Sequence, residues 1–175
     1  EHHDEDEDHD EEEHEEGHDD HGGLILANYL QEDAELDGYE LEIGRVFNLA
    51  SGDLEVSFSR DVVNGSLSSG MNIPRMSPAR NIYSVGYSVN DYLFDLSFKD
   101  VDSQTDTAEE ESATSGYQML DAKLVRTFDL NGSSLRVSVF ANNLLDEVAR
   151  NHASFVKNQV PLPGKNFGLR FNLSF

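Results

Sequence analysis

The sequence predicts an all-β fold of antiparallel strands, because apolar and polar side chains alternate with a period of two in most of the chain. Residues 166–175 are the clearest example, with five large apolar side chains on one face and polar residues or glycine on the other. The second observation is that short and long connections alternate strictly between these segments. Short turns at one end and long loops at the other are typical of outer-membrane barrels. We therefore expect an antiparallel transmembrane β-barrel.

Seven segments carry the alternation. The first, residues 24–47, is interpreted as one long strand that includes the polar stretch 31–37. Two strands around a polar hairpin are the alternative, but they would place the acidic N-terminal segment on the short-turn side. The other six strands are expected at 54–59, 82–89, 92–99, 120–125, 135–140 and 166–175.

The connections set the topology. Short turns are expected near 48–53, 89–91 and 129–132, where Asn131-Gly132 is a strong hairpin signal. Long loops are expected at 64–80, 101–116 and 144–164. Because bacterial single-chain barrels have an even number of strands, from eight upwards, seven strands are expected to be the C-terminal part of a larger barrel. With the C-terminus in the periplasm, residues 1–23 are extracellular.

Composition excludes several classes of protein. The net charge is −23 and no Lys or Arg precedes Arg45, so we expect no nucleic-acid partner. The absence of Cys excludes disulfides and thiolate metal sites. No apolar run is long enough for a spanning helix, and no signal peptide is present, so we expect a fragment. No catalytic motif is present, and we expect no enzyme and no catalytic cofactor.

Residues 1–21 carry 14 acidic residues and six of the seven histidines, with Gly17 as the one other residue. With nothing apolar to bury, residues 1–23 are predicted to be a disordered extracellular loop. Imidazole binds Zn²⁺, Cu²⁺ and Ni²⁺, while the carboxylates concentrate divalent cations. The alternative is a solvated acidic loop that binds ions incidentally. The candidate metal ligands are His2, His3, His9, His14, His18 and His21.

Several motifs resemble the TonB-dependent outer-membrane receptors. Residues 139–146 (VFANNLLD) are similar to the end of the penultimate strand in that family, and residues 161–175 resemble its last loop and strand. Residues 31–42 (QEDAELDGYELE) and 73–80 (IPRMSPAR) also resemble family motifs, in the family's order. The resemblance covers residues 24–175 and implies a 22-stranded barrel, of which this chain would supply about seven C-terminal strands without the plug domain.

Within that family, residues 151–155 (NHASF) ahead of 161–164 (PLPG) are most like the zinc-uptake receptors. The resemblance implies Zn²⁺ as the transported ligand, with outer-membrane lipid as a partner and the TonB complex engaged through the absent N-terminal parts. His152 becomes a seventh candidate metal ligand, and the alternative is a loop histidine bonded to the backbone.

The predicted function is energised uptake of a divalent metal across the outer membrane of a Gram-negative bacterium, and the resemblance implies that this metal is zinc. The alternatives are a receptor for a siderophore or another metal complex, a passive porin, and a non-transporting, β-rich metal scavenger. Glu40 and Glu42 are expected on the lumen face, where they either pass cations inward or simply form a polar wall. A soluble protein would bury Phe167, Leu169 and Phe171 in a core, which distinguishes it from a barrel.

Overall fold

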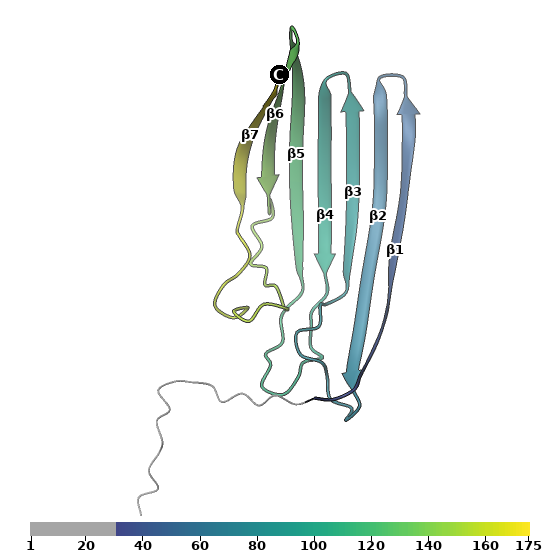
Figure 1. Ribbon diagram of the computed structural model, residues 1–175, viewed down its shortest axis with the longest axis vertical. Helices are drawn as coiled ribbons and strands as arrows, with labels where there is room; N and C mark the ends of the chain where they lie inside the picture. The colour runs from purple at the N-terminus through teal and green to yellow at the C-terminus, as the bar shows by residue number, and fades with distance from the viewer. Residues whose placement is uncertain (1–30) are drawn as a thin grey trace, which may run out of the picture. The chain divides into compact units, whose positions relative to one another are not determined.

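A computed structural model describes residues 31–175, and a single antiparallel sheet of seven strands forms the body of this part of the chain (Figure 1). Each strand pairs with its neighbours in the sequence, in the order β1 to β7. The all-β prediction and the count of seven strands are confirmed. The strands are β1 (Ala34–Leu49), β2 (Gly52–Leu67), β3 (Arg80–Val89), β4 (Tyr92–Val101), β5 (Tyr117–Leu130), β6 (Ser133–Asn142) and β7 (Asn166–Ser174).

Residues 31–175 contain no helix that is long and apolar enough to cross a membrane. The predicted disordered loop 1–23, with its six histidines, lies outside the described residues, as do residues 24–30 of the predicted first strand.

Three two-residue turns connect the strands at one end of the sheet, and the long loops lie at the other (Figure 1). In the turn between β5 and β6, Asn131 and Gly132 both have positive φ angles, of 47° and 100°. That conformation suits type I′ hairpin turns, whose twist matches that of the strands. The Asn-Gly hairpin prediction is therefore confirmed.

The first hairpin differs from the prediction in two places. Residues 31–33 are not in a strand, and β2 continues to Leu67, through residues expected to begin a long loop. The physical reason lies in the register, which pairs Ala34 with Leu67 and Asp37 with Asn64. Cross-strand backbone bonds thus extend the ladder over a polar, Gly-containing segment that carries no apolar pattern.

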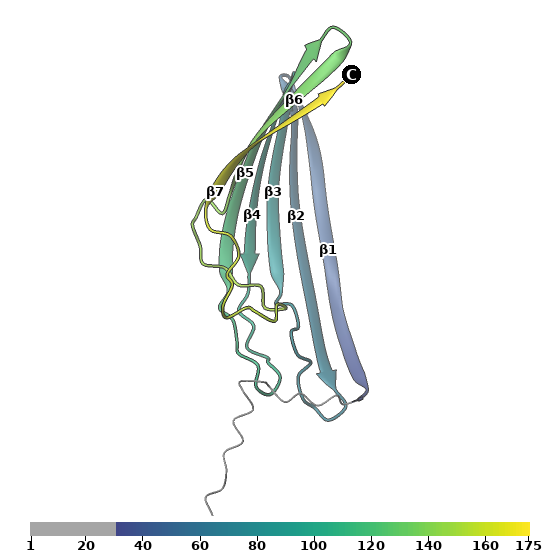
Figure 2. The same cartoon turned by 60° about the vertical axis from the view of Figure 1, so that its left-hand side comes forward.

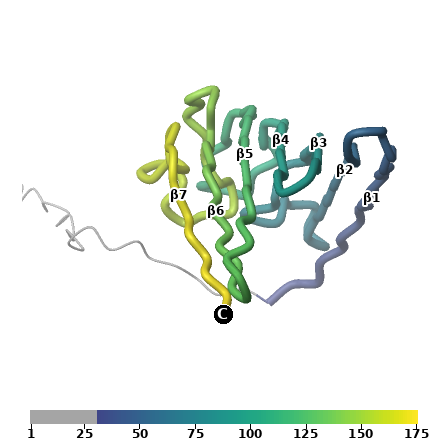
Figure 3. The backbone as a smooth tube through the Cα atoms, turned by 90° about the horizontal axis from the view of Figure 1, so that it is seen from above, coloured from purple at the N-terminus to yellow at the C-terminus, as the bar shows by residue number. Residues whose placement is uncertain are grey.

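One face of the sheet is apolar and exposed. Phe167, Leu169 and Phe171 on β7 are 70%, 63% and 64% exposed, and the register places them beside apolar residues of β6. In residues 31–175 the buried apolar side chains are only Val101, Val125 and Ala149. The sheet is twisted and curved (Figures 2 and 3), but the described strands do not close on themselves, since β1 and β7 are its edges. Within residues 31–175, no closed protein core covers the apolar face.

The opposite face is polar. Lys123 forms an ion pair with Asp95, with 3.1 Å between Nζ and Oδ2. Further along the same row, the ring of Phe140 on β6 lies over Gly168 on β7, in the space that a side chain at residue 168 would need. The glycine leaves room for the outer end of the aromatic ring against the neighbouring strand, and this packing favours one register of β6 and β7.

Candidate functional site

The three long loops lie at the same end of the sheet and bond to one another. They are the β2–β3 loop (68–79), the β4–β5 loop (102–116) and the β6–β7 loop (143–165). Asn72 in the first donates to the carbonyl oxygen of Thr107 in the second at 3.0 Å. Ser112 in the second is hydrogen-bonded to Asn158 in the third. The loops therefore form one connected assembly.

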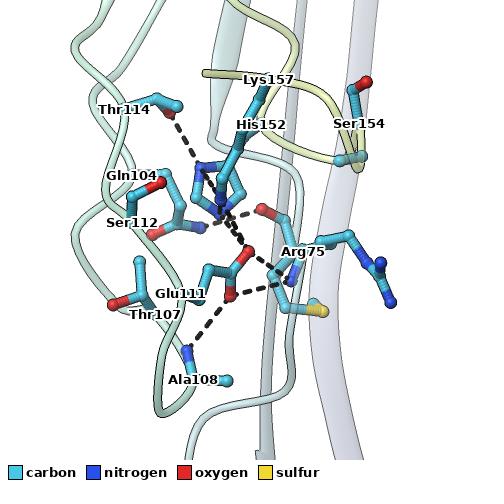
Figure 4. Close-up of polar contacts among 12 residues, drawn as sticks. Arg75, Gln104, Thr107, Ala108, Glu111, Ser112, Thr114, His152, Ser154 and Lys157 are labelled. Carbon is cyan, nitrogen blue, oxygen red and sulfur yellow. Dashed lines mark hydrogen bonds and ion pairs between the residues drawn. The ribbon is translucent and has the colours of Figure 1, made fainter. Parts of the chain in front are cut away.

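A group of polar side chains, which we call the loop cluster, joins these loops: Glu111 and Thr114 from the β4–β5 loop, and His152 and Lys157 from the β6–β7 loop (Figure 4). Glu111 Oε1 lies 2.8 Å from Lys157 Nζ and 3.1 Å from His152 Nε2. Thr114 Oγ1 lies 2.9 Å from His152 Nδ1. All four side chains are buried or nearly so.

The β2–β3 loop joins the cluster through its backbone. The N–H of Arg75 donates to both carboxylate oxygens of Glu111, at 3.0 and 3.1 Å, and the N–H of Ala108 donates to Oε2 at 3.1 Å (Figure 4). The guanidinium of Arg75 lies over the ring of Phe155, 3.5 Å from its centroid. Glu111 is therefore the one carboxylate in the described residues that holds all three loops together.

Charges in the loop cluster balance without protonating the histidine. Burial alone would raise the pKa of Glu111, but the hydrogen bonds from Lys157 and from the Arg75 and Ala108 backbone outweigh it and lower that pKa to about 2. Burial lowers the pKa of His152, and the positive charge of Lys157 adds to that effect. The cluster thus consists of an ionised carboxylate, an ammonium and a neutral imidazole.

Both ring nitrogens of His152 have partners. A neutral imidazole can donate from Nε2 to Glu111 and accept at Nδ1 from the Thr114 hydroxyl, which gives both ring nitrogens a hydrogen-bond partner. Residues 31–175 hold no group of three or more His, Cys, Asp or Glu side chains arranged for a metal ion. Metal binding by His152 stays a prediction, and it would require a change in these contacts.

The other candidate residues lie elsewhere. His2, His3, His9, His14, His18 and His21 are outside the described residues, so their role as metal ligands stays a prediction. Glu40 and Glu42 lie on the polar face of β1, as expected. There Glu40 pairs in register with Asp61, which forms an ion pair with Arg80 at 2.6 Å.

Sequence reasoning missed Glu111 and Lys157. Both lie in loops without periodicity, and Glu111 follows two other glutamates that are exposed. The two residues of this ion pair are 46 positions apart in the sequence, so no local spacing of residues indicates that they interact. Only the burial of a charged pair identifies them, and burial is not visible in a loop sequence.

A buried asparagine fixes the base of the β6–β7 loop. Asn143, fully buried with a φ of 49°, begins the NLLD part of the motif at 139–146. Its side chain donates to the carbonyl oxygens of Glu147 and Pro163 and accepts from the N–H of Glu147, while its own N–H donates to Asp121. Asn143 thereby links the start of the loop to its end and to β5.

Replacing Asn143 with alanine should destabilise the fold by about 2–4 kcal/mol, because buried backbone groups lose their partners and alanine disfavours the left-handed conformation. Denaturant unfolding of the purified protein in detergent measures this loss. Asn158→Ala, at an exposed position bonded to one side chain, is the matched control and should cost well below 1 kcal/mol. Equal losses for the two variants would contradict this role for Asn143.

Comparisons with known proteins support the fold. A scan against protein-family models and a search of curated proteins find no match. Among solved structures, the chain is similar to the copper transporter OprC, with a TM-score of 0.70 and 19% sequence identity over 82% of this chain and 24% of that one. At this identity the similarity shows the fold alone, and the chain spans less than two thirds of that transporter's length.

Proposed function

We propose that this chain forms part of an outer-membrane β-barrel receptor that takes up a divalent metal ion. The observation that carries the proposal is the exposed apolar face, which is opposite a polar face on the same strands. Leaving large aromatic and aliphatic side chains in water is unfavourable, whereas lipid is a suitable partner for them. The polar face then lines the lumen, with Glu40 and Glu42 on it.

The apolar face has a polar border towards the loop end. Arg60 on β2 donates to the Tyr39 hydroxyl at 2.9 Å and to Asn81 on β3 at 2.7 Å. Gln118 on β5 donates to Asp100 on β4 at 3.1 Å. The register places Phe58, Tyr83 and Phe98 in the next row towards the turns. A polar row on the loop side of an aromatic row is the order expected where the strands of an outer-membrane barrel leave the lipid.

The composition of the N-terminal segment indicates which kind of ion is taken up. Six imidazoles among 14 carboxylates in residues 1–21 favour capture of Zn²⁺, Cu²⁺ or Ni²⁺. One solved structure similar to this chain is a copper transporter, whereas the resemblance of 151–164 to zinc-uptake receptors favours zinc. Capture at extracellular loops would then feed the barrel, with TonB supplying energy through parts of the receptor beyond this chain.

Deleting residues 1–21 from the full-length receptor tests the capture step. We expect uptake at limiting zinc or copper to fall about tenfold, because the segment raises the local concentration of cations. Radiometal uptake by cells and calorimetric titration of the purified receptor measure the loss. A variant with six His→Ser changes retains the 14 carboxylates and separates imidazole binding from charge. If uptake and affinity are unchanged after the deletion, the segment has no capture role.

The other candidate functions have their own outcomes. A receptor for a siderophore or another metal complex would transport the complex and leave the free ion outside. A non-transporting scavenger would bind metal but accumulate none in the cell. A passive porin would transport without TonB, so uptake in a strain lacking TonB distinguishes it.

A further inference from the structure

Lys157 places a cation where two metal-ligating groups meet. Its ammonium lies 2.8 Å from Glu111 Oε1 and 3.3 Å from His152 Nε2, and those two atoms are 3.1 Å apart. Carboxylate oxygen and imidazole nitrogen are common ligands of Zn²⁺ and Cu²⁺. The distances from the ammonium to Nε2 and Nδ1 of His152 are 3.3 and 3.5 Å, so it lies over the face of the ring and beside Glu111 Oε1 (Figure 4). An ion contacting both Oε1 and Nε2 would lie close to this positive charge and be repelled by it.

The surroundings suit a metal ion as well as the ammonium. Coordination by Nε2 of His152 requires the proton on Nδ1, and the Thr114 hydroxyl at 2.9 Å can accept a hydrogen bond from Nδ1–H as readily as it can donate one to a bare Nδ1. Such a partner on the far nitrogen is the usual way in which a metal-binding histidine is oriented. Glu111 stays fixed by the Arg75 and Ala108 backbone, whatever cation it faces.

We propose that Lys157 is a built-in competitor for a divalent metal at Glu111 and His152. Metal binding at this pair is an exchange, in which the ion displaces the ammonium to the loop surface and water completes the coordination. Because Glu111 and His152 come from two loops, the metal maintains the link that the ammonium makes without metal. The choice of zinc or copper as the ion rests on the proposed function.

Lys157→Met tests the competition directly. Methionine retains an apolar stem of similar length, and the carbonyl oxygen of Lys157, which accepts from Arg150, is unaffected. In the full-length protein without residues 1–21, we expect Zn²⁺ to bind about tenfold more tightly to the variant, because a buried positive charge no longer opposes the ion. Lys165→Met, at an exposed residue of the same loop, is the control and should leave zinc affinity unchanged.

Two further measurements keep the proposal falsifiable. The gain in affinity must disappear in Lys157→Met/His152→Ala, and in the wild-type protein Zn²⁺, unlike Mg²⁺, must increase amine labelling of Lys157 measured by mass spectrometry. The labelling needs no variant, so it remains informative if Lys157→Met folds poorly. Folded Lys157→Met with wild-type zinc affinity, or labelling that zinc does not change, overturns the proposal.

These results separate the inference from the proposed function. A protein that shows the exchange in the test tube but supports no metal uptake in cells retains the inference and loses the transport proposal. A protein that transports zinc or copper without the exchange retains transport and loses the role of Lys157.

Discussion

Replacing Glu111 with alanine is expected to open the loop assembly, at a cost of about 3–5 kcal/mol. The variant leaves the buried ammonium of Lys157 without its counter-ion and removes the acceptor for the Arg75 and Ala108 N–H groups. Hydrogen exchange of the backbone amides in residues 68–79, 102–116 and 143–165 measures the opening. Protection there should fall by about a hundredfold or more, since each 1.4 kcal/mol is a factor of ten.

Glu109→Ala is the matched control for that experiment, because Glu109 is an exposed glutamate in the same loop. Its loop protection should remain close to that of the wild-type protein. Full protection of all three loops in Glu111→Ala would show that the other contacts between the loops are sufficient.

Lowering the pH should reduce the protection of the loops as Glu111→Ala does. The pKa of Glu111 is about 2 in the folded protein, compared with an ordinary value of 4.5. A lowered carboxyl pKa stabilises the folded state above the ordinary value, and this contribution is lost as the pH falls from 4.5 towards 2. Loop protection that falls in this window for the wild-type protein, but much less in Glu111→Ala, identifies Glu111 as the titrating group.

Replacing Gly168 with alanine should destabilise the sheet by about 1–3 kcal/mol, because the new Cβ atom overlaps the ring of Phe140 on the neighbouring strand. Denaturant unfolding in detergent measures this, and β6–β7 backbone amides should lose protection first. Gly86→Ala on β3 is the matched control, since a Cβ atom there has only ordinary contacts, at 3.5 and 3.8 Å.

A second substitution tests the cause. If the overlap with the ring is responsible, Gly168→Ala should destabilise the sheet less when it is combined with Phe140→Leu. A double-mutant cycle measures this difference. A cost for Gly168→Ala that equals that of Gly86→Ala would contradict the packing of Phe140 on Gly168.

The sheet was predictable because its strands have two different faces. Alternation of apolar and polar side chains predicts a strand with one apolar and one polar face. Asn131-Gly132 predicts a hairpin turn from local conformational preference alone. The extension of β2 to Leu67 was not predictable, because Asn64, Gly65 and Ser66 look like a loop and join the sheet only through backbone pairing. Register with a partner strand is a tertiary property that the pattern of one strand does not contain.

The candidate site was predictable in part. His152 was identified by resemblance, and the structure places it at the centre of the loop cluster. Its neighbours were not identified, because Glu111 and Lys157 are common surface residue types whose burial depends on how three aperiodic loops fold together. The role of Asn143 was likewise hidden inside a motif whose resemblance was visible but whose hydrogen bonds were not.

The strictly sequential pairing of the strands has a consequence for the order of folding. Each strand meets a partner one turn or loop away in the chain, so the sheet can grow by the addition of one strand at a time, although paired residues can be as distant in the sequence as Ser134 and Ser174. The loop cluster is different because it needs three loops at once: Glu111 pairs with Lys157, 46 residues further along the chain, and accepts from the N–H of Arg75 in the β2–β3 loop. The sheet can therefore form before the loop cluster, which is complete only when all three loops are in place.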